Sequence, residues 1–483
     1  MPIGRHAIFL SVLASALCAV AANAADITLT IDDSHRFQTI EGFGACLYLG
    51  ADHPYDQSWY QDLYAKDLGA SIIRMELTPW VLGKDMSKPV PLGEDLEANI
   101  ARMDFSAAGG IDAATMIRAT NARKLDRLLL IGSLWTPPHW MKTGATLTPA
   151  GNSSGGHLKM DADNLEQFAR YVAAYVKGFE RACGTPFYAI SIQNELMFKE
   201  TYNSCQYTPR EYHDAIAAVG REFAKDKIAT KIMGPEGVGP DAGFFTNAQM
   251  GWIDAVESDP ATADYLSLFC IHGYGGNGVD ILSDGRALTD YWNTIQHFGK
   301  ESWMTESSGE NPAWLHTGAD GKEDGALSVA RHIHEGLVDG NFSAILYWQC
   351  CDGRGPISRE NLMGPDEASA RDSGKYACAK QFFRYIRPGS QRVDVSPQTA
   401  TLGASAFVND KDNALTIVLV NTSGQGRAVA LQLPKPLSAR KFHVVRSTAT
   451  ERCAIQPDIA ASAGAATVLL PAYAVVTIYR GSE

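Results

Sequence analysis

The sequence predicts an α/β fold, a (β/α)8 TIM barrel, with a β-sandwich packed at its side as a C-terminal domain. Three features predict it. Eight apolar, β-branched runs recur along residues 25–388, helical patterns fill the intervals between them, and short alternating strands replace both after Pro388. Strands that alternate with helices are typical of a parallel barrel, whereas short strands without helices favour a sandwich.

The eight candidate strands are short and end in polar or aromatic residues. They cover residues 41–47, 71–77, 128–135, 188–195, 231–237, 266–274, 301–307 and 344–351. Between them apolar residues recur at helical spacing, most clearly at 164–182 and 210–226. In a barrel the carboxyl ends of all eight strands meet on one face, which is where enzymes of this fold place their active sites.

The chain divides into three predicted parts. Residues 1–24 form a signal peptide, because Arg5 precedes an apolar run that closes on the small-x-small sequence Ala22-Asn23-Ala24. Residues 25–388 form the barrel and 389–483 the sandwich, to which the alternating segment 25–40 contributes a strand. We therefore expect a secreted or periplasmic protein without a membrane anchor, since no other stretch approaches about 20 uninterrupted apolar residues.

Composition and charge narrow the classes of partner. The 483 residues are 45% hydrophobic and 20% charged, which is ordinary globular composition, and the formal net charge is −12. A negative chain is a poor partner for nucleic acid or an anionic membrane. A neutral ligand suits it better, and we expect the protein to act as a monomer.

Cysteine spacing gives no sign of a metal site. Of nine cysteines, Cys18 belongs to the predicted signal peptide, and the remaining eight match no zinc pattern. No metal or other cofactor is therefore expected. Scattered disulfides and buried thiols both remain open, and Cys183 with Cys205 is one pair that could bridge.

Carboxylates stand at the ends of several candidate strands: Glu41, Glu76, Glu195, Glu236 and Glu306. Glu195 ends the fourth strand, in the run AISIQNE, and Glu306 ends the seventh, so the two would face each other across the barrel mouth. Opposed carboxylates suit glycoside hydrolysis, in which one donates a proton to the leaving oxygen while the other attacks the anomeric carbon. We interpret Glu76 and Glu236 as rim residues or ion-pair partners.

Motifs at these strand ends resemble glycoside hydrolase family 30, in clan A. They are EGFG at 41–44, SLWTPPHWMK at 133–142, SIQNE at 191–195, HGY at 272–274 and WMTE at 303–306, followed by QFFRYIRPG at 381–389. The resemblance runs in order along nearly the whole chain that follows the predicted signal peptide. It implies a retaining β-glycoside hydrolase.

The resemblance also implies roles for single residues. Glu195 matches the general acid/base, Asn194 its neighbour that hydrogen-bonds the sugar 2-hydroxyl, and Glu306 the nucleophile. Arg74 matches the arginine of the clan's second strand, which would help to keep Glu306 ionised, because a nearby guanidinium lowers the pKa of a carboxylate. Tyr274 would add a hydroxyl near that carboxylate.

Aromatic and polar residues at strand ends are further candidates for substrate contact. Trp135 and Trp348, together with Trp140 and Trp303, suit sugars, whose C–H faces stack on aromatic rings. For any one of them, packing in the barrel core is an equal alternative. His272 is expected to be a hydrogen-bonded residue of the rim.

The resemblance leaves several substrates open. It includes secreted β-xylanases that hold a glucuronic acid branch of xylan with arginine and aromatic residues after strand eight. Here Arg354 is the only cation in that region, Asp352 would oppose an anionic branch, and Leu196 replaces the proline that is usual after the acid/base. We expect endo-acting cleavage of β-1,4-xylan or glucuronoxylan. The alternatives are an exo-acting β-xylosidase, β-glucosidase or β-fucosidase, an endo-β-1,6-glucanase and, from another class, a non-catalytic sugar-binding protein.

Overall fold

The computed structural model describes residues 25–49, 53–106, 110–240, 246–275, 285–309, 311–318, 321, 323–353, 360–434 and 441–481. The predicted signal peptide lies outside these residues. Within them, no helix combines the length and the apolar character that crossing a bilayer requires.

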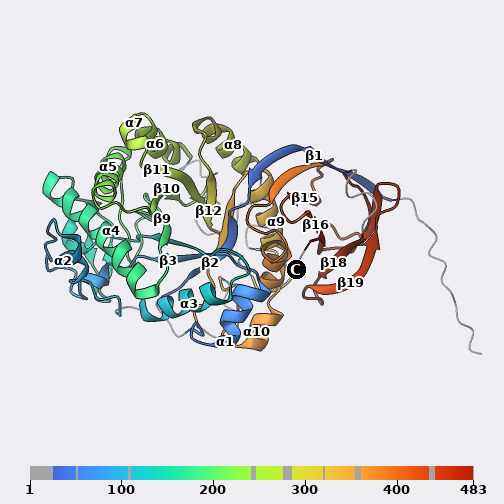
Figure 1. The fold of residues 1–483 in the computed structure, drawn as a ribbon, viewed down its shortest axis with the longest axis horizontal. Coiled ribbons are helices and arrows are strands. Elements are labelled where there is room, and N and C mark those ends of the chain that lie inside the picture. The colour runs from blue at the N-terminus through green and yellow to red at the C-terminus, as the bar shows by residue number, and fades with distance from the viewer. Residues whose placement is uncertain are drawn as a thin grey trace, which may run out of the picture.

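Eight parallel strands close into a barrel (Figure 1), which confirms the predicted fold class. Each overlaps one predicted run, and β13 pairs with β2, from Ala344 opposite Gly42 to Tyr347 opposite Ala45. In order around the barrel they are β2 (Gly42–Leu47), β3 (Ile72–Glu76), β4 (Leu129–Ser133), β9 (Phe187–Ser191), β10 (Lys231–Gly237), β11 (Leu266–His272), β12 (Ser302–Glu306) and β13 (Ala344–Tyr347).

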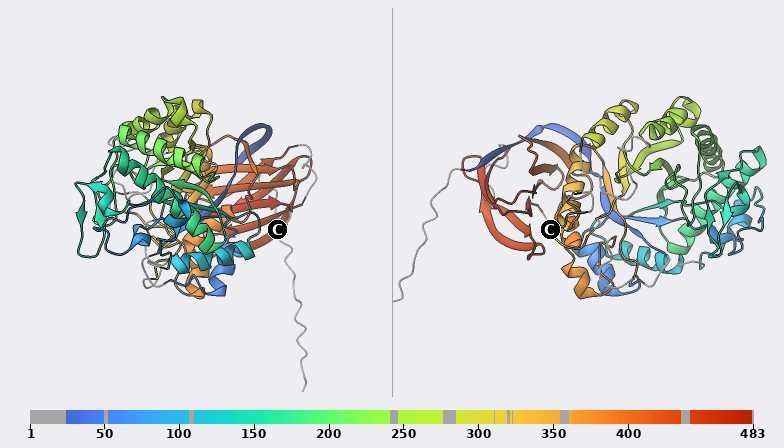
Figure 2. Two further views of the ribbon diagram at one scale, coloured as in Figure 1. Left: turned by 60° about the vertical axis from the view of Figure 1, so that its left-hand side comes forward. Right: turned by 180° about the vertical axis from the view of Figure 1, so that it is seen from behind.

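Helices cover the outside of the barrel (Figures 1 and 2). The longer ones are α3 (Gly110–Arg123), α4 (Ala162–Cys183), α5 (Pro209–Lys225), α6 (Thr246–Glu257), α8 (Gly285–Ile295), α9 (Ala326–Val338) and α11 (Gly374–Phe383). The shorter ones are α1 (Ser58–Asp62), α2 (Leu96–Ile100), α7 (Pro260–Ala263) and α10 (Glu367–Asp372).

Local chemistry sets the ends of the two helices that the sequence predicts most clearly. Helix α4 begins where the Asp161 side chain accepts a hydrogen bond from the Asn164 N–H, and it ends at Gly184, whose φ of 73° is left-handed. Helix α5 begins with a capping box, in which Thr208 and Glu211 each accept a hydrogen bond from the other's backbone N–H.

The barrel interior is packed with apolar side chains. Ile72, Leu268 and Trp303 are among the fully buried residues that fill it. Because alternate residues of a strand face the same side, Arg74 and His272 face this interior one or two layers above Ile72 and Leu268. The polar groups at the carboxyl ends of the strands therefore lie on a packed layer of apolar side chains.

The loop after β4 carries two short hairpins that a buried lysine ties to the loop after β9. Lys142 is only 5% exposed, and its Nζ donates to Thr136 Oγ1, to both oxygens of Ser153 and to Ser204 O. The hairpins pair β5 (Lys142–Thr143) with β8 (His157–Leu158), and β6 (Thr146–Leu147) with β7 (Ser153–Ser154).

The remaining strands form one nine-stranded sheet that curls around its own apolar core, which includes Leu29, Ile417 and Val444 (Figure 2). The N-terminal strand β1 lies inside this sheet, antiparallel to β14 and parallel to β17. The strands, in sequence order, are β1 (Ile27–Thr39), β14 (Gln391–Ser396), β15 (Leu402–Asn409), β16 (Ala414–Asn421), β17 (Arg427–Gln432), β18 (Lys441–Ser447), β19 (Ala454–Ala460), β20 (Ala465–Leu470) and β21 (Ala474–Arg480).

Helices α9 and α11 lie between the barrel and the curled sheet (Figure 1). Gln381 of α11 donates from Nε2 to Ser447 Oγ at 2.8 Å, and its carbonyl accepts from Thr477 Oγ1 at 2.8 Å. Thr416 Oγ1 donates to Tyr385 O at 2.7 Å. Because these contacts are largely buried, the two domains form one tightly joined body.

None of the eight cysteines of the described chain forms a disulfide, and seven of them are buried. Cys183 donates to Thr185 O at 3.1 Å, and the bridge to Cys205 that the sequence allowed is not formed. Of the two alternatives, scattered disulfides and buried thiols, the described residues show buried thiols.

Candidate active site

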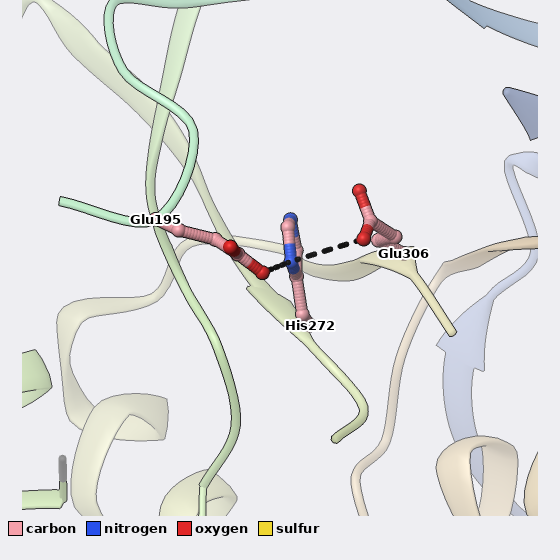
Figure 3. Close-up of side chains that lie close together, drawn as sticks. All are labelled: Glu195, His272 and Glu306. Carbon is pink, nitrogen blue, oxygen red and sulfur yellow. Dashed lines mark hydrogen bonds and ion pairs between the residues drawn. The ribbon is translucent and has the colours of Figure 1, made fainter. Parts of the chain in front are cut away.

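Glu195 and Glu306 face each other at the carboxyl end of the barrel (Figure 3). Glu306 ends β12, and Glu195 follows β9. One carboxylate oxygen of each lies within 4.8 Å of the other. Direct attack by one carboxylate needs a separation of about 5 to 5.5 Å between the carboxyl groups, whereas attack by water needs about 6.5 to 9.5 Å. The observed spacing fits direct attack.

Main-chain contacts explain why the apolar strand β9 runs on into polar residues. The Asn194 N–H donates to Leu134 O at 2.6 Å, and the Glu195 N–H donates to Glu236 O at 2.8 Å, so the barrel's hydrogen bonding continues past the end of β9. Glu195 has a φ of 51°, a left-handed conformation that costs on the order of 1 kcal/mol for a residue with a side chain. Its neighbours hold it there and fix the position of its carboxylate.

Arg74 is completely buried and connects the groups of the site. Its Nη1 donates to Glu306 Oε2 at 2.6 Å, its Nη2 to Asn194 Oδ1 at 2.7 Å, and its Nε to Ser133 Oγ at 3.2 Å. The Nε also lies 3.3 Å from Glu236 Oε1. One guanidinium thus holds the predicted nucleophile and the predicted 2-hydroxyl partner.

The Glu306 carboxylate is held by two donors, Arg74 on Oε2 and the Tyr274 hydroxyl on Oε1 at 3.0 Å. Burial raises the pKa of Glu306, and the charge of Glu195 acts in the same direction, whereas His272 and Arg74 lower it. The net pKa is raised. This differs from the lowering expected from Arg74 alone, because burial outweighs the guanidinium.

His272 stands between the two carboxylates (Figure 3). Its Nδ1 lies 3.0 Å from Glu195 Oε1 and 3.7 Å from Glu306 Oε1, and its Nε2 lies 3.9 Å from Glu236 Oε1. Burial lowers the pKa of His272, but the three carboxylates together raise it to about 9. The imidazole is therefore a cation at neutral pH and donates its Nδ1–H to Glu195.

Glu236 is a third, fully buried carboxylate beneath this pair. Burial raises its pKa, but the charge of Arg74 and the proximity of His272 lower the pKa to about 2. Glu236 therefore stays anionic and balances two cations. Of the two roles that the sequence suggested for it, the structure shows the ion-pair partner.

The aromatic candidates separate into two kinds. Trp135 and Trp348 lie together at the barrel mouth, with ring centroids 5.8 Å apart, and the Arg74 guanidinium lies 4.8 Å from the centre of the Trp135 ring. Trp303 is fully buried and stacks on Tyr188 with centroids 5.6 Å apart. Of the two roles left open for Trp303, the structure shows core packing, because this ring fills the barrel interior.

Two residues near the site escaped the sequence analysis. Tyr202 is 44% exposed and donates a hydrogen bond to Glu200, in the loop that follows Glu195. Burial and then the charge of Glu195 raise the pKa of Glu200 to about 7. Neither residue ends a strand, so only closeness to Glu195 in the sequence could have pointed to them.

The other predicted positions lie apart from the carboxylate pair or beyond the described chain. Glu76 ends β3, where burial raises its pKa to about 7 although a hydrogen bond from Asn203 opposes this. Asp352 is buried and accepts a hydrogen bond from Asn361 Nδ2 at 2.8 Å. Arg354 lies outside the described residues.

Glu195, His272 and Glu306 also present donor atoms within 4.8 Å of one another, a spacing that a metal ion can fill. The charges at the site oppose such an ion. A histidine can bind a metal only as a neutral imidazole, whereas His272 is protonated at neutral pH. Arg74 already donates a hydrogen bond to Glu306. The arrangement suits proton transfer and nucleophilic attack better.

Comparison with known proteins agrees with this architecture. The model of the Glycosyl hydrolase family 30 beta sandwich domain matches residues 389–478. The glucuronoxylanase XynC of Bacillus subtilis (strain 168) is 26% identical over 299 residues, which are 62% of this chain and only 61% of that protein. The endo-1,6-beta-D-glucanase neg1 of Aspergillus fumigatus is 29% identical over 441 residues and covers 82% of this chain and 81% of its own.

A solved structure extends the likeness to both domains. The glycoside hydrolase family 30 subfamily 8 xylanase Xyn30A from Clostridium acetobutylicum matches with a TM-score of 0.72 and 24% identity, over 94% of this chain and 100% of its own. This likeness concerns the fold, a barrel with a side sheet. The match of the side domain and the glucuronoxylanase relative, together with the strand-end motifs, show that this chain is similar to glycoside hydrolase family 30.

Proposed function

We propose that this protein is a retaining β-glycoside hydrolase in which Glu306 is the nucleophile and Glu195 the acid/base. The observation that carries the proposal is a pair of carboxylates within 4.8 Å of each other in different surroundings. Glu306 accepts hydrogen bonds from Arg74 and Tyr274, which favour its anion. Different surroundings are what allow two carboxylates to take different roles.

In the first step a carboxylate oxygen of Glu306 attacks the anomeric carbon. The bond between that carbon and the glycosidic oxygen breaks, and Glu195 donates its proton to the departing oxygen. Because His272 donates to Oε1 of Glu195, its Oε2 is the oxygen left to carry that proton. The product is a glycosyl ester on Glu306.

In the second step Glu195 is the base. Esterified Glu306 carries no charge, so it no longer opposes a negative charge on Glu195. The Glu195 carboxylate takes a proton from water, the oxygen of that water attacks the anomeric carbon, and the ester bond breaks. Two inversions restore the original configuration.

Trapping tests the assignment of the nucleophile. A 2-deoxy-2-fluoro glycoside with a good leaving group should add one sugar mass to the peptide that contains Glu306, and proton NMR should show the β-anomer first. Glu306→Gln should lower kcat/KM by roughly 10³-fold or more. A label on another residue, or the α-anomer appearing first, would overturn the mechanism. Wild-type protein that binds glycans without turnover would support the sugar-binding alternative.

We propose that the substrate is polymeric β-xylan and that the enzyme cleaves bonds in the interior of the polysaccharide. We also propose that the protein is exported. The glucuronoxylanase relative supports xylan as the substrate, as does the pair Trp135 and Trp348 at the barrel mouth. The second candidate is β-1,6-glucan, because the endo-1,6-beta-D-glucanase relative covers 82% of this chain. The small-x-small sequence that ends at Ala24 supports export.

Product profiles distinguish these substrates. Purified protein is incubated with glucuronoxylan, unbranched xylan and β-1,6-glucan, and products are followed by mass spectrometry, with Glu306→Gln as the control for contaminating activity. Oligomers with a uronate at a fixed position would show branch-directed endo-xylanase action. Oligomers from β-1,6-glucan alone would favour the second candidate, and single sugars from any substrate would show exo action and overturn the endo proposal.

A further inference from the structure

A cavity of about 280 Å³ lies between the barrel and the side sheet. Its walls come from the end of α11 and the segment that follows it, from strands of the side sheet and from Asp67. Asp67 precedes β3, toward the amino ends of the barrel strands, whereas Glu195 and Glu306 lie at the carboxyl ends. The cavity is therefore separate from the candidate active site.

The wall of this cavity is rich in cations. Two of them are neutralised by partners in the barrel, since Lys380 Nζ lies 2.6 Å from Asp67 Oδ1 and Arg387 Nη2 lies 2.6 Å from Asp126 Oδ2. The four cationic side chains that line it are Lys380, Arg384, Arg387 and Arg480.

Arg384 and Arg480 are not neutralised in this way. Among the described residues, neither side chain makes a hydrogen bond or an ion pair, and Nη1 of Arg480 is buried without a partner. A buried donor without a partner destabilises the fold, and a charged donor does so more strongly. Asp412 also lines the cavity, but it is exposed in the turn between β15 and β16, and one carboxylate cannot balance two guanidinium groups.

Aromatic surface lies beside these guanidinium groups. Tyr385 and Tyr479 both line the cavity, and their rings pack together with centroids 4.6 Å apart. The cavity therefore combines positive charge with ring faces, in a chain whose formal net charge is −12. Domain interfaces are among the places where small-ligand sites preferentially occur.

We propose that this interdomain cavity binds a small oxyanion, a carboxylate or a phosphate, between Arg384 and Arg480. A guanidinium presents parallel N–H groups that match both anions. Free phosphate and the carboxylate of an acidic sugar are two sources of the same chemistry, and the tyrosine rings would contact the body of the sugar. Because Arg384 follows α11 and Arg480 ends β21, the bound anion holds the barrel and the side sheet together.

Binding to the full chain tests this proposal. Thermal unfolding and calorimetric titration are run with sodium phosphate against sodium chloride at equal ionic strength, and with sodium glucuronate against glucose. The variants are Arg384→Gln and Arg480→Gln, and the control is Lys411→Gln, which removes an exposed lysine beside Asp412 that does not line the cavity. We expect a rise in Tm with the anion, retained in Lys411→Gln, and binding weakened by about 10-fold or more in each arginine variant.

Each outcome decides the proposal. If only phosphate binds in an arginine-dependent way, the site is a phosphate site. If only glucuronate does, the site takes an acidic sugar, and if both do, it takes oxyanions in general. No binding, or binding that both arginine variants retain, would overturn it. Should the variants fail to fold, protection of Arg384 and Arg480 by phosphate against phenylglyoxal in the wild-type chain gives the same answer. Hydrolysis by Arg384→Gln stays at the wild-type rate, so a failure here is distinct from a failure of the proposed function.

Discussion

The Glu306 carboxylate must be ionised to attack, and its neighbours decide at which pH this happens. Burial raises its pKa, so activity should be lost at a higher pH than an ordinary glutamate would give. The His272 cation, 3.7 Å from Glu306 Oε1, lowers this pKa, and Arg74 acts in the same direction. The acidic limb of the pH–activity profile is therefore a readout of His272.

His272→Asn should move that acidic limb upward. Loss of the cation removes a positive charge that lowers the pKa of Glu306, so kcat/KM should begin to fall about one pH unit higher than in the wild type. The measurement is kcat/KM against pH, with His443→Asn in the exposed part of the side sheet as the matched control. An acidic limb that stays in place would contradict the role assigned to His272.

Glu236→Gln should destabilise the fold by about 3–5 kcal/mol, because it removes the fully buried carboxylate that Arg74 and His272 share. The pKa of Glu236 is depressed to about 2 in the folded state, so its contribution is complete above the unfolded value near 4.5 and is lost as the pH falls toward 2. Denaturant unfolding of variant and wild type should thus converge in acid.

The control for Glu236→Gln is Glu41→Gln. Glu41 pairs with Arg127, which is 49% exposed, at the other end of the barrel. Such a surface pair is worth at most about 1 kcal/mol. Equal losses of unfolding free energy in the two variants would show that burial does not make the ion pairs of Glu236 contribute more than a surface pair.

At the scale of elements, Lys142 joins the hairpin loop after β4 to the loop after β9, which carries Glu195 at its start. Its ammonium satisfies carbonyl and hydroxyl oxygens of both loops while almost completely buried. Methionine fills the same space but makes none of these bonds, so it leaves the oxygens buried without donors.

Lys142→Met should therefore lower the free energy of unfolding by about 2–4 kcal/mol and reduce kcat by loosening Glu195. Denaturant unfolding and steady-state kinetics check the two parts. Lys159→Met is the matched control, since Lys159 is exposed and, within the described part of the chain, its ammonium donates only to Trp140 O, at 2.7 Å. The interpretation fails if both lysine variants lose the same amount.

At the scale of the whole molecule, β1 makes the two domains interdependent. It enters the side sheet between β14 and β17 and then leads directly into β2 of the barrel. Removal of residues 25–39 should leave β14 and β17 without a shared neighbour and expose the apolar core of the sheet. We expect a single calorimetric transition for the intact chain, and loss of cooperative unfolding with aggregation for the truncated one.

Two well-separated calorimetric transitions in the intact chain would contradict this view. They would mean that the contacts of Gln381 and Thr416 across the interface contribute little. The same experiment gives the baseline for the proposed oxyanion site, because a ligand held between the domains should raise the temperature of one shared transition.

Periodicity and strand-end chemistry were enough to predict the barrel strands and the two facing carboxylates, and the strand-end motifs carried the resemblance to glycoside hydrolase family 30. These features are local, since a strand carries its alternation and its terminal polar residue in a few neighbouring positions. The side chain of Trp303 shows the limit. It was a possible sugar contact by residue type alone, but the pleat of β12 turns it into the barrel interior.

The sequence by itself thus determined which elements form and in what order, because hydrogen bonding and apolar periodicity act over short distances along the chain. Tertiary structure decided the charges: Arg74 meets Glu306 across 232 positions, and only the fold brings Glu236 beneath both. It also decided the net pKa of Glu306 and the pairing of cations in the interdomain cavity. Both depend on burial and on distances between strands far apart in sequence, which no local pattern contains.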